Sequence, residues 1–358
     1  MRIAFHAPMK PPDHPLPSGD RTMGRLLMQA LRAAGHEVFL ASRLRTREPE
    51  GDPRAQNHIG SIARQEVTML SARLLEDPPD LWFTYHLYYK APDLIGPAIC
   101  DVLDIPYAVA EASHAAKRME GPHSEFARQA LKAIERADAI FCMTERDRRG
   151  LDDIVPQSRL HDLKPFVRQR PRPSAKSSGK PIRLLTVAMM RPGDKMQSYG
   201  LLADALNHIR DRDWHLTIVG DGSMARLVRQ AFASFGSRVT FSGMVPPSRL
   251  DRIYATHDLF LWPAVNEAYG LALLEASARG MPVIAGNEGG VSEVVRHRMN
   301  GILVKPRDAH AFARQTAQVL DDRNLFLRLQ SESWRQVERH HQVSHAARNL
   351  DRVLKSLC

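Results

Sequence analysis

Short apolar runs alternate with longer amphipathic stretches along almost the whole chain, and this alternation constrains the fold more than any other feature. The runs are rich in β-branched and aromatic residues, which is typical of strands buried on both faces of a parallel sheet. The predicted strands are residues 2–6, 37–41, 81–85, 107–110, 139–143 and 159–163, followed by residues 182–188, 215–220, 238–242, 259–262, 282–285 and 302–304. Helical stretches separate them, so the sequence predicts an α/β protein with two doubly wound parallel sheets.

A segment with the Pro, Ser and Lys content of a linker separates the two sets of strands. We therefore expect a first domain over residues 1–170, a linker over 171–181 and a second domain over 182–322. Residues 323–358 have helical spacing and no later strand, so we expect helices that pack back on the first domain.

Cysteine content and hydropathy narrow the class of protein. Cys100, Cys142 and Cys358 are an odd number without paired spacing, so neither a disulfide framework nor a cysteine-based zinc site is predicted. The chain has no leader-like N-terminus and no apolar run of membrane-spanning length. We expect a cytoplasmic protein, with the inner face of the membrane as an alternative location.

The net charge of +10 is distributed unevenly. Basic residues exceed acidic ones by 2 over residues 1–175 and by 8 over residues 176–358, which favours an anionic ligand in the second half. Aromatic residues are few and are not interleaved with basic ones, which argues against nucleic-acid binding. Arginine clusters at 43–47 and 146–149 fit either solvated loops or contacts with anionic lipid or a phosphorylated acceptor.

Two carboxylates mark the most informative segment of the second half. Glu267 precedes an apolar helix and Glu275 lies within it. Carboxylates bind hydroxyl groups, and amides at a helix entrance can bind phosphate or sugar oxygens because they have no intrahelical partner. The amides at this entrance belong to Ala268, Tyr269, Gly270 and Leu271. Alternatively, Glu267 only complements the helix dipole and Glu275 pairs with Arg279 one turn later.

The residues after this helix favour the ligand-binding alternative. Residues 281–286 form a short buried-strand pattern, and a Gly289-Gly290 turn then leads into a second predicted helix with Ser292 as its N-cap. Two helix entrances and a glycine turn would meet at one site for a polyhydroxylated anion.

These motifs, in this order, resemble the donor-binding segment of family 4 retaining glycosyltransferases, which have the two-domain GT-B fold. The shared pattern is the pair Glu267 and Glu275 with TyrGly after the first, then GlyMetProValIleAla, GlyGlyValSerGlu and AsnGlyIleLeuVal. Coarser similarity includes ValGlyAspGlySerMet at residues 219–224. The resemblance implies two Rossmann-like domains facing a central cleft.

The resemblance assigns the donor to the second domain. It implies that Glu275 binds the ribose hydroxyls of a nucleotide-diphosphate sugar, that Glu267 binds the transferred sugar, and that the amides of Tyr269, Gly270 and Leu271 hold the diphosphate. The family usually has Gly-Arg followed by Lys five residues after the Arg, whereas this chain has Ala188-Met189 there. Arg191, four residues before Lys195, is the candidate to replace the missing guanidinium. Further residues placed around the nucleotide are Gly220, Gly243, Met244 and Val245.

The first domain would carry the acceptor side of the reaction. Gly19 stands where the family often has a Gly-Gly turn beside the diphosphate, but Asp20 replaces the second glycine. His114 matches a family histidine near the donor sugar, and His86 ends the preceding strand; either could orient the acceptor, or both could be ordinary surface histidines.

The implied reaction is a front-face transfer with retention of configuration, without a metal ion or an organic cofactor. The acceptor would be a glycan, a lipid-linked sugar or a small molecule, in the assembly of a cell-surface glycan or glycolipid. The alternatives are an epimerase or a sugar-phosphate-accepting synthase on the same fold, and a catalytically silent nucleotide-sugar-binding protein.

Other motifs are weaker. Asp211 and Asp213 have metal-binding spacing but precede their strand, so we interpret them as a solvated turn. A full dinucleotide-binding glycine motif is missing, which argues against a nicotinamide enzyme. The histidines at 340, 341 and 345 suit a surface helix better than a metal site.

Overall fold

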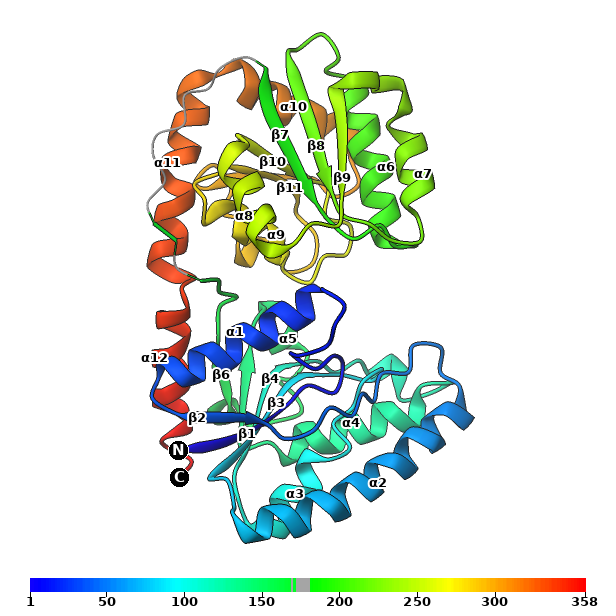
Figure 1. Ribbon diagram of the computed structural model, residues 1–358, viewed down its shortest axis with the longest axis vertical. Helices are drawn as coiled ribbons and strands as arrows, with labels where there is room; N and C mark the ends of the chain where they lie inside the picture. The colour runs from blue at the N-terminus through cyan, green and yellow to red at the C-terminus, as the bar shows by residue number, and fades with distance from the viewer. Residues whose placement is uncertain (169, 172–180) are drawn as a thin grey trace. The chain divides into compact units, whose positions relative to one another are not determined.

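The computed structural model describes residues 1–168, 170–171 and 181–358 (Figure 1). Most of the predicted linker, residues 171–181, therefore lies outside the described residues. The chain divides into two compact units, one of Met1–Lys164 with Val343–Cys358 and the other of Pro165–Gln342. Each unit contains one six-stranded parallel sheet, so the predicted pair of doubly wound, Rossmann-like domains is confirmed.

The first unit begins with a strand and a capped helix. The Ser18 hydroxyl accepts a hydrogen bond from the Arg21 amide at 3.1 Å, which satisfies a free amide at the helix start. Its strands are β1 (Arg2–His6), β2 (Glu37–Leu40), β3 (Leu81–Leu87), β4 (Tyr107–Ala112), β5 (Ala139–Cys142) and β6 (Leu160–Asp162). Its helices are α1 (Gly19–Ala33), α2 (Pro53–Glu76), α3 (Gly96–Leu103), α4 (Ser124–Arg136), α5 (Glu145–Arg149) and α12 (Val343–Leu354), with 3₁₀ turns η1 (Ala116–Arg118) and η2 (Gln157–Arg159).

The second unit repeats the strand–helix plan. Its strands are β7 (Ile182–Val187), β8 (Trp214–Val219), β9 (Val239–Gly243), β10 (Leu259–Trp262), β11 (Val283–Gly286) and β12 (Gly301–Val304). Its helices are α6 (Asp194–Asn207), α7 (Ala225–Ala231), α8 (Pro247–Thr256), α9 (Leu271–Ser277), α10 (Ala309–Asp321) and α11 (Arg323–His340), with 3₁₀ turns η3 (Ala233–Arg238) and η4 (Val291–Glu293).

Strand order locates one switch point in each sheet. The first sheet has the order β2-β1-β3-β4-β5-β6 and the second β12-β11-β10-β7-β8-β9. The direction of winding therefore reverses between β1 and β3 in the first sheet and between β7 and β10 in the second. In doubly wound sheets, ligands bind beyond the carboxyl ends of the strands at this point.

Helices cover both faces of each sheet (Figure 1). In the first unit, α1 and α12 pack together on one face and α2, α3 and α4 cover the other. In the second unit, α6 packs between α7 and α10, while α9 packs against β10, β11 and α11. Of the two C-terminal helices, α11 thus stays in the second unit and α12 packs along α1 in the first.

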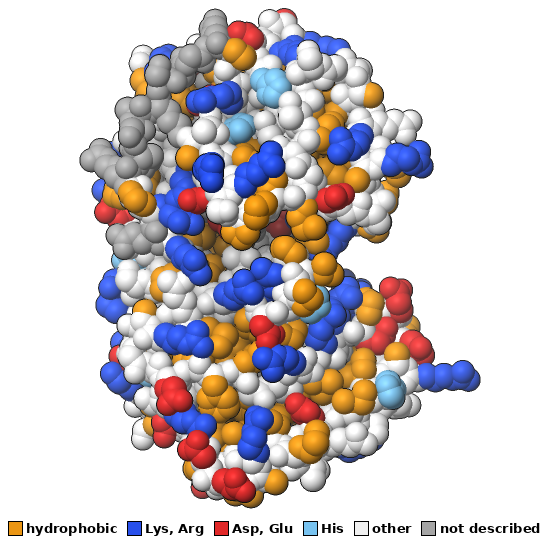
Figure 2. Space-filling view, in the orientation of Figure 1, with side chains coloured by type: hydrophobic (Ala, Val, Ile, Leu, Met, Phe, Trp, Pro, Cys, Tyr) orange, Lys and Arg blue, Asp and Glu red, His pale blue; other side chains and the backbone are white. Residues whose placement is uncertain are grey.

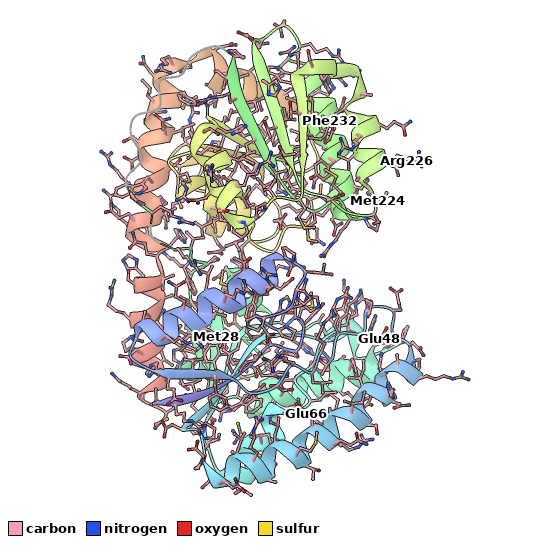
Figure 3. All side chains as sticks on the ribbon, in the orientation of Figure 1. Met28, Glu48, Glu66, Met224, Arg226 and Phe232 are labelled. Carbon is pink, nitrogen blue, oxygen red and sulfur yellow. The ribbon has the colours of Figure 1, made fainter. Side chains whose placement is uncertain are left out.

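Burial follows the amphipathic pattern of the helices. On α7 Arg226 points away from the second unit, whereas Phe232, which follows that helix, is 1% exposed beneath it (Figure 3).

Lys and Arg side chains are spread over the face shown in Figure 2 and do not form one continuous stripe there. Among the helices of the described residues, none is both long and apolar enough to cross a membrane.

Candidate active site

Lys195 and Glu267 meet across the switch point of the second sheet. Lys195 follows β7, at the start of α6, and Glu267 follows β10. The Lys195 Nζ donates to Glu267 Oε2 at 2.5 Å, and the Trp262 indole donates to the same oxygen at 3.0 Å. The Lys195 and Glu267 side chains stay 31% and 16% exposed, so a ligand can reach both. A cation and a carboxylate are therefore paired at the place where ligands bind in this fold.

The loop that carries Glu267 has an unusual backbone. Ala264 and Asn266 adopt φ angles of 57° and 47°, in the left-handed region that costs a residue with a Cβ about 1–2 kcal/mol. Two hydrogen bonds of 3.0 Å connect the loop to α6. The backbone amide of Val265 donates to Ser198 Oγ, and the side-chain amide of Asn266 donates to Asp194 Oδ2. Such strain, held in place by neighbouring contacts, is concentrated at functional loops.

The predicted glycine turn packs directly on this loop. The Gly290 amide donates to the carbonyl oxygens of Glu267 and Ala268 at 3.2 and 2.7 Å. Gly289 has a φ of +68°, and a Cβ there would overlap the Glu267 carbonyl. The helix predicted after this turn is wrong, because only the three-residue η4 forms, with Gly290 and not Ser292 as its N-cap. The sequence between Val294 and Asn300 instead returns to the sheet through a turn.

The entrance of α9 lies directly beyond Glu267. Gly270, at φ 75°, is the N-cap, and its carbonyl accepts from Leu273 N at 2.9 Å. Leu271 is the first helical residue, so its amide has no acceptor within the helix. Tyr269 is 6% exposed, whereas Ala268 is exposed. Of the four amides named from the sequence, those of Gly270 and Leu271 lie at the helix entrance, whereas Ala268 and Tyr269 precede the N-cap.

Glu275 is partly buried one turn into α9. Its Oε2 accepts a hydrogen bond from the Tyr254 hydroxyl of α8 at 3.0 Å. Burial raises the pKa of Glu275, while the Tyr254 hydrogen bond and the charge of Arg170 act in the opposite direction. The alternative pairing with Arg279 is wrong, because Arg279 forms its ion pair with Asp251.

The other residues that the resemblance assigns to the nucleotide gather at the ends of β7, β8 and β9. Gly220 N donates to Gly243 O at 2.9 Å, and a Cβ at Gly220 would overlap the carbonyl of Ala188. Met244 is 62% exposed beyond them, beside Val245. The structure therefore brings these residues, Lys195, Glu267 and the α9 entrance to the same edge of one sheet.

Arg191 is less constrained than Lys195. Its side chain is exposed, and among the described residues it has no hydrogen bond or ion pair. The structure thus leaves Arg191 in the loop after β7 without fixing its guanidinium.

In the first sheet, Asp20 and His86 meet across the corresponding switch point. Asp20 lies at the start of α1 after β1, beside Gly19, and His86 lies near the end of β3. His86 Nδ1 is 3.2 Å from Asp20 Oδ1, and their side chains are 19% and 26% exposed. Asp20, the departure from the family's second glycine, therefore supplies the counter-ion of a histidine.

Glu111 was not predicted and lies next to His86. The register pairs Tyr85 with Ala110 and Leu87 with Ala112, which places His86 opposite Glu111. Both adopt positive φ, 65° and 59°, and Glu111 Oε2 is buried without a hydrogen-bond partner among the described residues. The sequence does carry a signal for Glu111, because a charged residue directly follows the predicted buried strand over residues 107–110.

The charges in this group shift one another's pKa values. Burial would lower the pKa of His86, but the carboxylates of Glu111 and Asp20 outweigh it and raise that pKa to about 9. Burial raises the pKa of Glu111 to about 7 and also raises the pKa of Asp147, at the start of α5. At the ends of these strands His86 thus lies among the carboxyl groups of Asp20, Glu111 and Asp147.

His114 lies apart from these bonds. It follows β4 and is partly buried, and within the described ranges it makes no hydrogen bond or ion pair. Its carbonyl oxygen faces Gly150, where a Cβ would lie 3.5 Å away.

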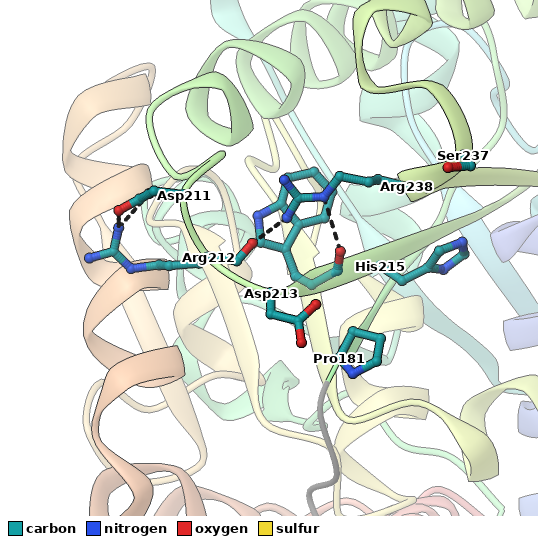
Figure 4. Close-up of a pocket in the computed structure, with 8 residues that line it drawn as sticks. Pro181, Asp211, Arg212, Asp213, His215, Ser237 and Arg238 are labelled. Atoms are coloured by element: carbon teal, nitrogen blue, oxygen red, sulfur yellow. Dashed lines mark hydrogen bonds and ion pairs between the residues drawn. The ribbon is translucent and has the colours of Figure 1, made fainter.

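Two weaker sequence motifs are placed away from the switch points. Asp211 and Asp213 line an open depression with Trp214 and Arg238 at the amino ends of the second sheet's strands (Figure 4). That edge is opposite the one that holds Lys195 and Glu267. His341 is buried and its Nδ1 lies 2.7 Å from the Pro165 carbonyl oxygen, so the surface location predicted for it is wrong.

The fold defines the class of protein. A solved sucrose-phosphate synthase from Thermosynechococcus elongatus matches 99% of this chain and 98% of its own, with a TM-score of 0.77 and 19% identity. Anabaena HepE in complex with UDP matches 100% of both chains, with a TM-score of 0.75 and 15% identity. Together with the two six-stranded sheets, these matches show the GT-B fold.

The sequence comparison refines this class for one domain. Residues 181–322 match the family described as Glycosyl transferases group 1. The D-inositol 3-phosphate glycosyltransferase of Nocardia farcinica is 29% identical over 218 residues, 58% of this chain and 48% of that protein. A GDP-mannose-dependent alpha-(1-6)-phosphatidylinositol monomannoside mannosyltransferase of Mycobacterium tuberculosis is 35% identical over 187 residues, 47% of this chain and 49% of that protein. The chain thus spans about half the length of these curated relatives.

Proposed function

We propose that the protein is a retaining glycosyltransferase that takes a sugar from a nucleotide-diphosphate sugar without a metal ion. One observation carries the proposal: Lys195, Glu267 and the entrance of α9 converge at the switch point of the domain that matches the group 1 family, with Glu275 one turn away. This set combines a cation and the amides of Gly270 and Leu271 for a diphosphate with carboxylates for sugar hydroxyls.

The roles of the side chains follow from their chemistry. Lys195 and the amides of the α9 entrance bind the diphosphate, and Arg191 is free to turn toward it. Glu275 accepts hydrogen bonds from the ribose hydroxyls. Glu267, held by Lys195 and Trp262, accepts from the hydroxyls of the sugar to be transferred. Main-chain groups at Gly220 and from Gly243 to Val245 line the nucleoside.

The transfer needs little acid–base chemistry from the protein. The acceptor oxygen attacks the anomeric carbon on the face from which the nucleoside diphosphate leaves, and the bond from that carbon to the phosphate oxygen breaks. The departing phosphate oxygen takes the acceptor proton. Lys195 stabilises the charge that develops on the diphosphate, and each charge-assisted hydrogen bond contributes about 1.5–3 kcal/mol.

The first unit supplies the acceptor side in this proposal. Asp20, His86 and Glu111 gather at the switch point of its sheet, where a ligand of this fold binds. They provide one cationic donor and several acceptors for hydroxyl groups, and His114 belongs to the same edge. The names of the two relatives, which include inositol 3-phosphate and phosphatidylinositol monomannoside, support a small-molecule or lipid-linked acceptor. A glycan acceptor and assembly of a cell-surface glycan or glycolipid belong to the proposal on the resemblance alone.

The test is the thermal unfolding of the protein with UDP, GDP, ADP, CMP and NAD in the presence of EDTA. A ligand that binds only the folded state, at 100 times its Kd, adds about 2.7 kcal/mol, or a midpoint shift of about 5–10 °C. We expect one nucleoside diphosphate to give such a shift, Glu275→Ala to abolish it, and Glu338→Ala, which removes an exposed carboxylate of the same unit, to keep it. A shift with NAD alone, or none, would refute the proposal. A nucleotide shift without turnover would identify a silent binder.

A further inference from the structure

Tyr254 lies behind the carboxylate to which the proposed function assigns the ribose. It belongs to α8, is 3% exposed and stacks on Phe260 of β10, with ring centroids 6.3 Å apart at 22°. Its hydroxyl reaches Glu275 Oε2 at 3.0 Å, whereas the Ala272 carbonyl oxygen lies at 3.4 Å. A hydroxyl has one hydrogen, so the shorter contact to the charged oxygen is the stronger one.

An ion pair also joins α8 to the residues that follow α9. Asp251 lies one turn before Tyr254, and Arg279 lies one turn after Glu275. Asp251 forms ion pairs with Arg279 and, at 3.2 Å, with Arg170. Asp251 therefore holds the two segments together without touching the carboxylate, while Tyr254 does touch it.

We infer that Tyr254 is a positioning residue that aims the Glu275 carboxylate at the ribose hydroxyls of the nucleotide. This inference rests on the proposed function. The Tyr254 hydroxyl donates to Oε2 of Glu275. Within the described residues the other carboxylate oxygen, Oε1, accepts no hydrogen bond, so it can accept one from a ribose hydroxyl. The position of the hydroxyl is fixed, because its ring is buried and stacked on the sheet.

The hydrogen bond also favours the ionised form of Glu275. Burial raises the pKa of Glu275, and the Tyr254 hydroxyl and Arg170 oppose this rise. Without the hydroxyl the pKa moves higher, and a protonated carboxyl accepts hydrogen bonds less well. Nucleotide affinity falls at low pH as Glu275 is protonated, and loss of the hydroxyl should move this fall toward higher pH. A packing defect would not move it.

The experiment compares wild type, Tyr254→Phe and the matched control Asp251→Asn by isothermal titration calorimetry. The ligands are the nucleoside diphosphate that stabilises wild type and its 2′,3′-dideoxy analogue, each titrated from pH 5.5 to 8. We expect Tyr254→Phe to bind the ribonucleotide about tenfold more weakly, near the value for one hydrogen bond to a charged group. Its affinity for the dideoxy analogue should equal that of wild type, and its acid limb should move to higher pH. Asp251→Asn should weaken neither ligand selectively.

The outcomes separate the two hypotheses. If wild type binds no nucleoside diphosphate, the proposed function fails, and the role of Tyr254 fails with it. If wild type binds but Tyr254→Phe matches wild type, or weakens both ligands equally as Asp251→Asn would by loosening α8, only the inference about Tyr254 is overturned.

Discussion

Replacement of Gly289 by alanine should damage the proposed donor site from a position that no ligand needs to touch. Gly289 has a φ of +68°, and a Cβ there would lie 2.9 Å from the carbonyl carbon of Glu267 and closer still to its oxygen. Both are backbone atoms, so neither can rotate away as a side chain would. The left-handed conformation costs alanine about 1–2 kcal/mol, and displacement of the packed loop adds about 1–3 kcal/mol.

Gly236→Ala is the matched control. Gly236 belongs to the same unit and has a φ of +54°, but a Cβ added there would meet no heavy atom within 4 Å. With a ψ of −130°, Gly236 lies in another region that favours glycine, so Gly236→Ala should incur a conformational cost of about 1–3 kcal/mol without a clash. The comparison therefore isolates the clash with the Glu267 loop.

The assay is urea unfolding followed by tryptophan fluorescence, with nucleotide affinity measured on the folded variants. Trp214, Trp262 and Trp334 lie in the second unit, so the signal reports mainly on that unit. We expect Gly289→Ala to be about 1–3 kcal/mol less stable than Gly236→Ala and to lose nucleoside diphosphate binding, which Gly236→Ala should keep. Equal stability and equal binding in the two variants would refute this account of the loop.

Three further predictions concern charged groups. Lys195→Met should weaken nucleoside diphosphate binding about 10- to 100-fold, because it removes the cation that binds the diphosphate. Lys305→Met, which removes an exposed lysine of the same unit, should leave the affinity unchanged. Equal affinities of the two variants in calorimetry would show that the role given to Lys195 is wrong. Glu111 has a folded pKa of about 7, above the ordinary 4.5, so its contribution to stability is present below pH 4.5 and is lost as pH rises through 7. Glu111→Gln should flatten the fall in unfolding free energy between pH 5 and pH 8, and an unchanged slope would contradict this. Asp20→Asn should lower the pKa of His86 from about 9, measured by NMR titration of the ring.

The positions of the strands could be predicted because each is a local apolar pattern. All twelve predicted runs overlap the strands of the structure. The helix expected after Ser292 failed because its cap signal is short, while the backbone there is fixed by the hydrogen bonds of Gly290 to the Glu267 loop. Long-range contacts of this kind leave no periodic trace in the sequence.

The donor-side residues could be named because they form motifs of fixed spacing. Tyr254 could not be named, because it lies 21 residues from Glu275, and the pairing of Lys195 with Glu267 could not be predicted across 72 residues. Asp20 looked like a defect in the family pattern, and only the structure shows that it pairs with His86, far away in the chain. Glu111 became visible as a partner through the register of β3 and β4.

The most direct test of the central claim is proton NMR of the protein with nucleotide sugars such as UDP-glucose and GDP-mannose in EDTA. The spectrum records the anomeric doublet of the transferred or released sugar before it mutarotates. The account predicts that one donor is consumed, that the first sugar product has the anomeric configuration of the donor, and that Glu275→Ala abolishes the signal. Inverted configuration, or no turnover with any nucleotide sugar, would contradict it.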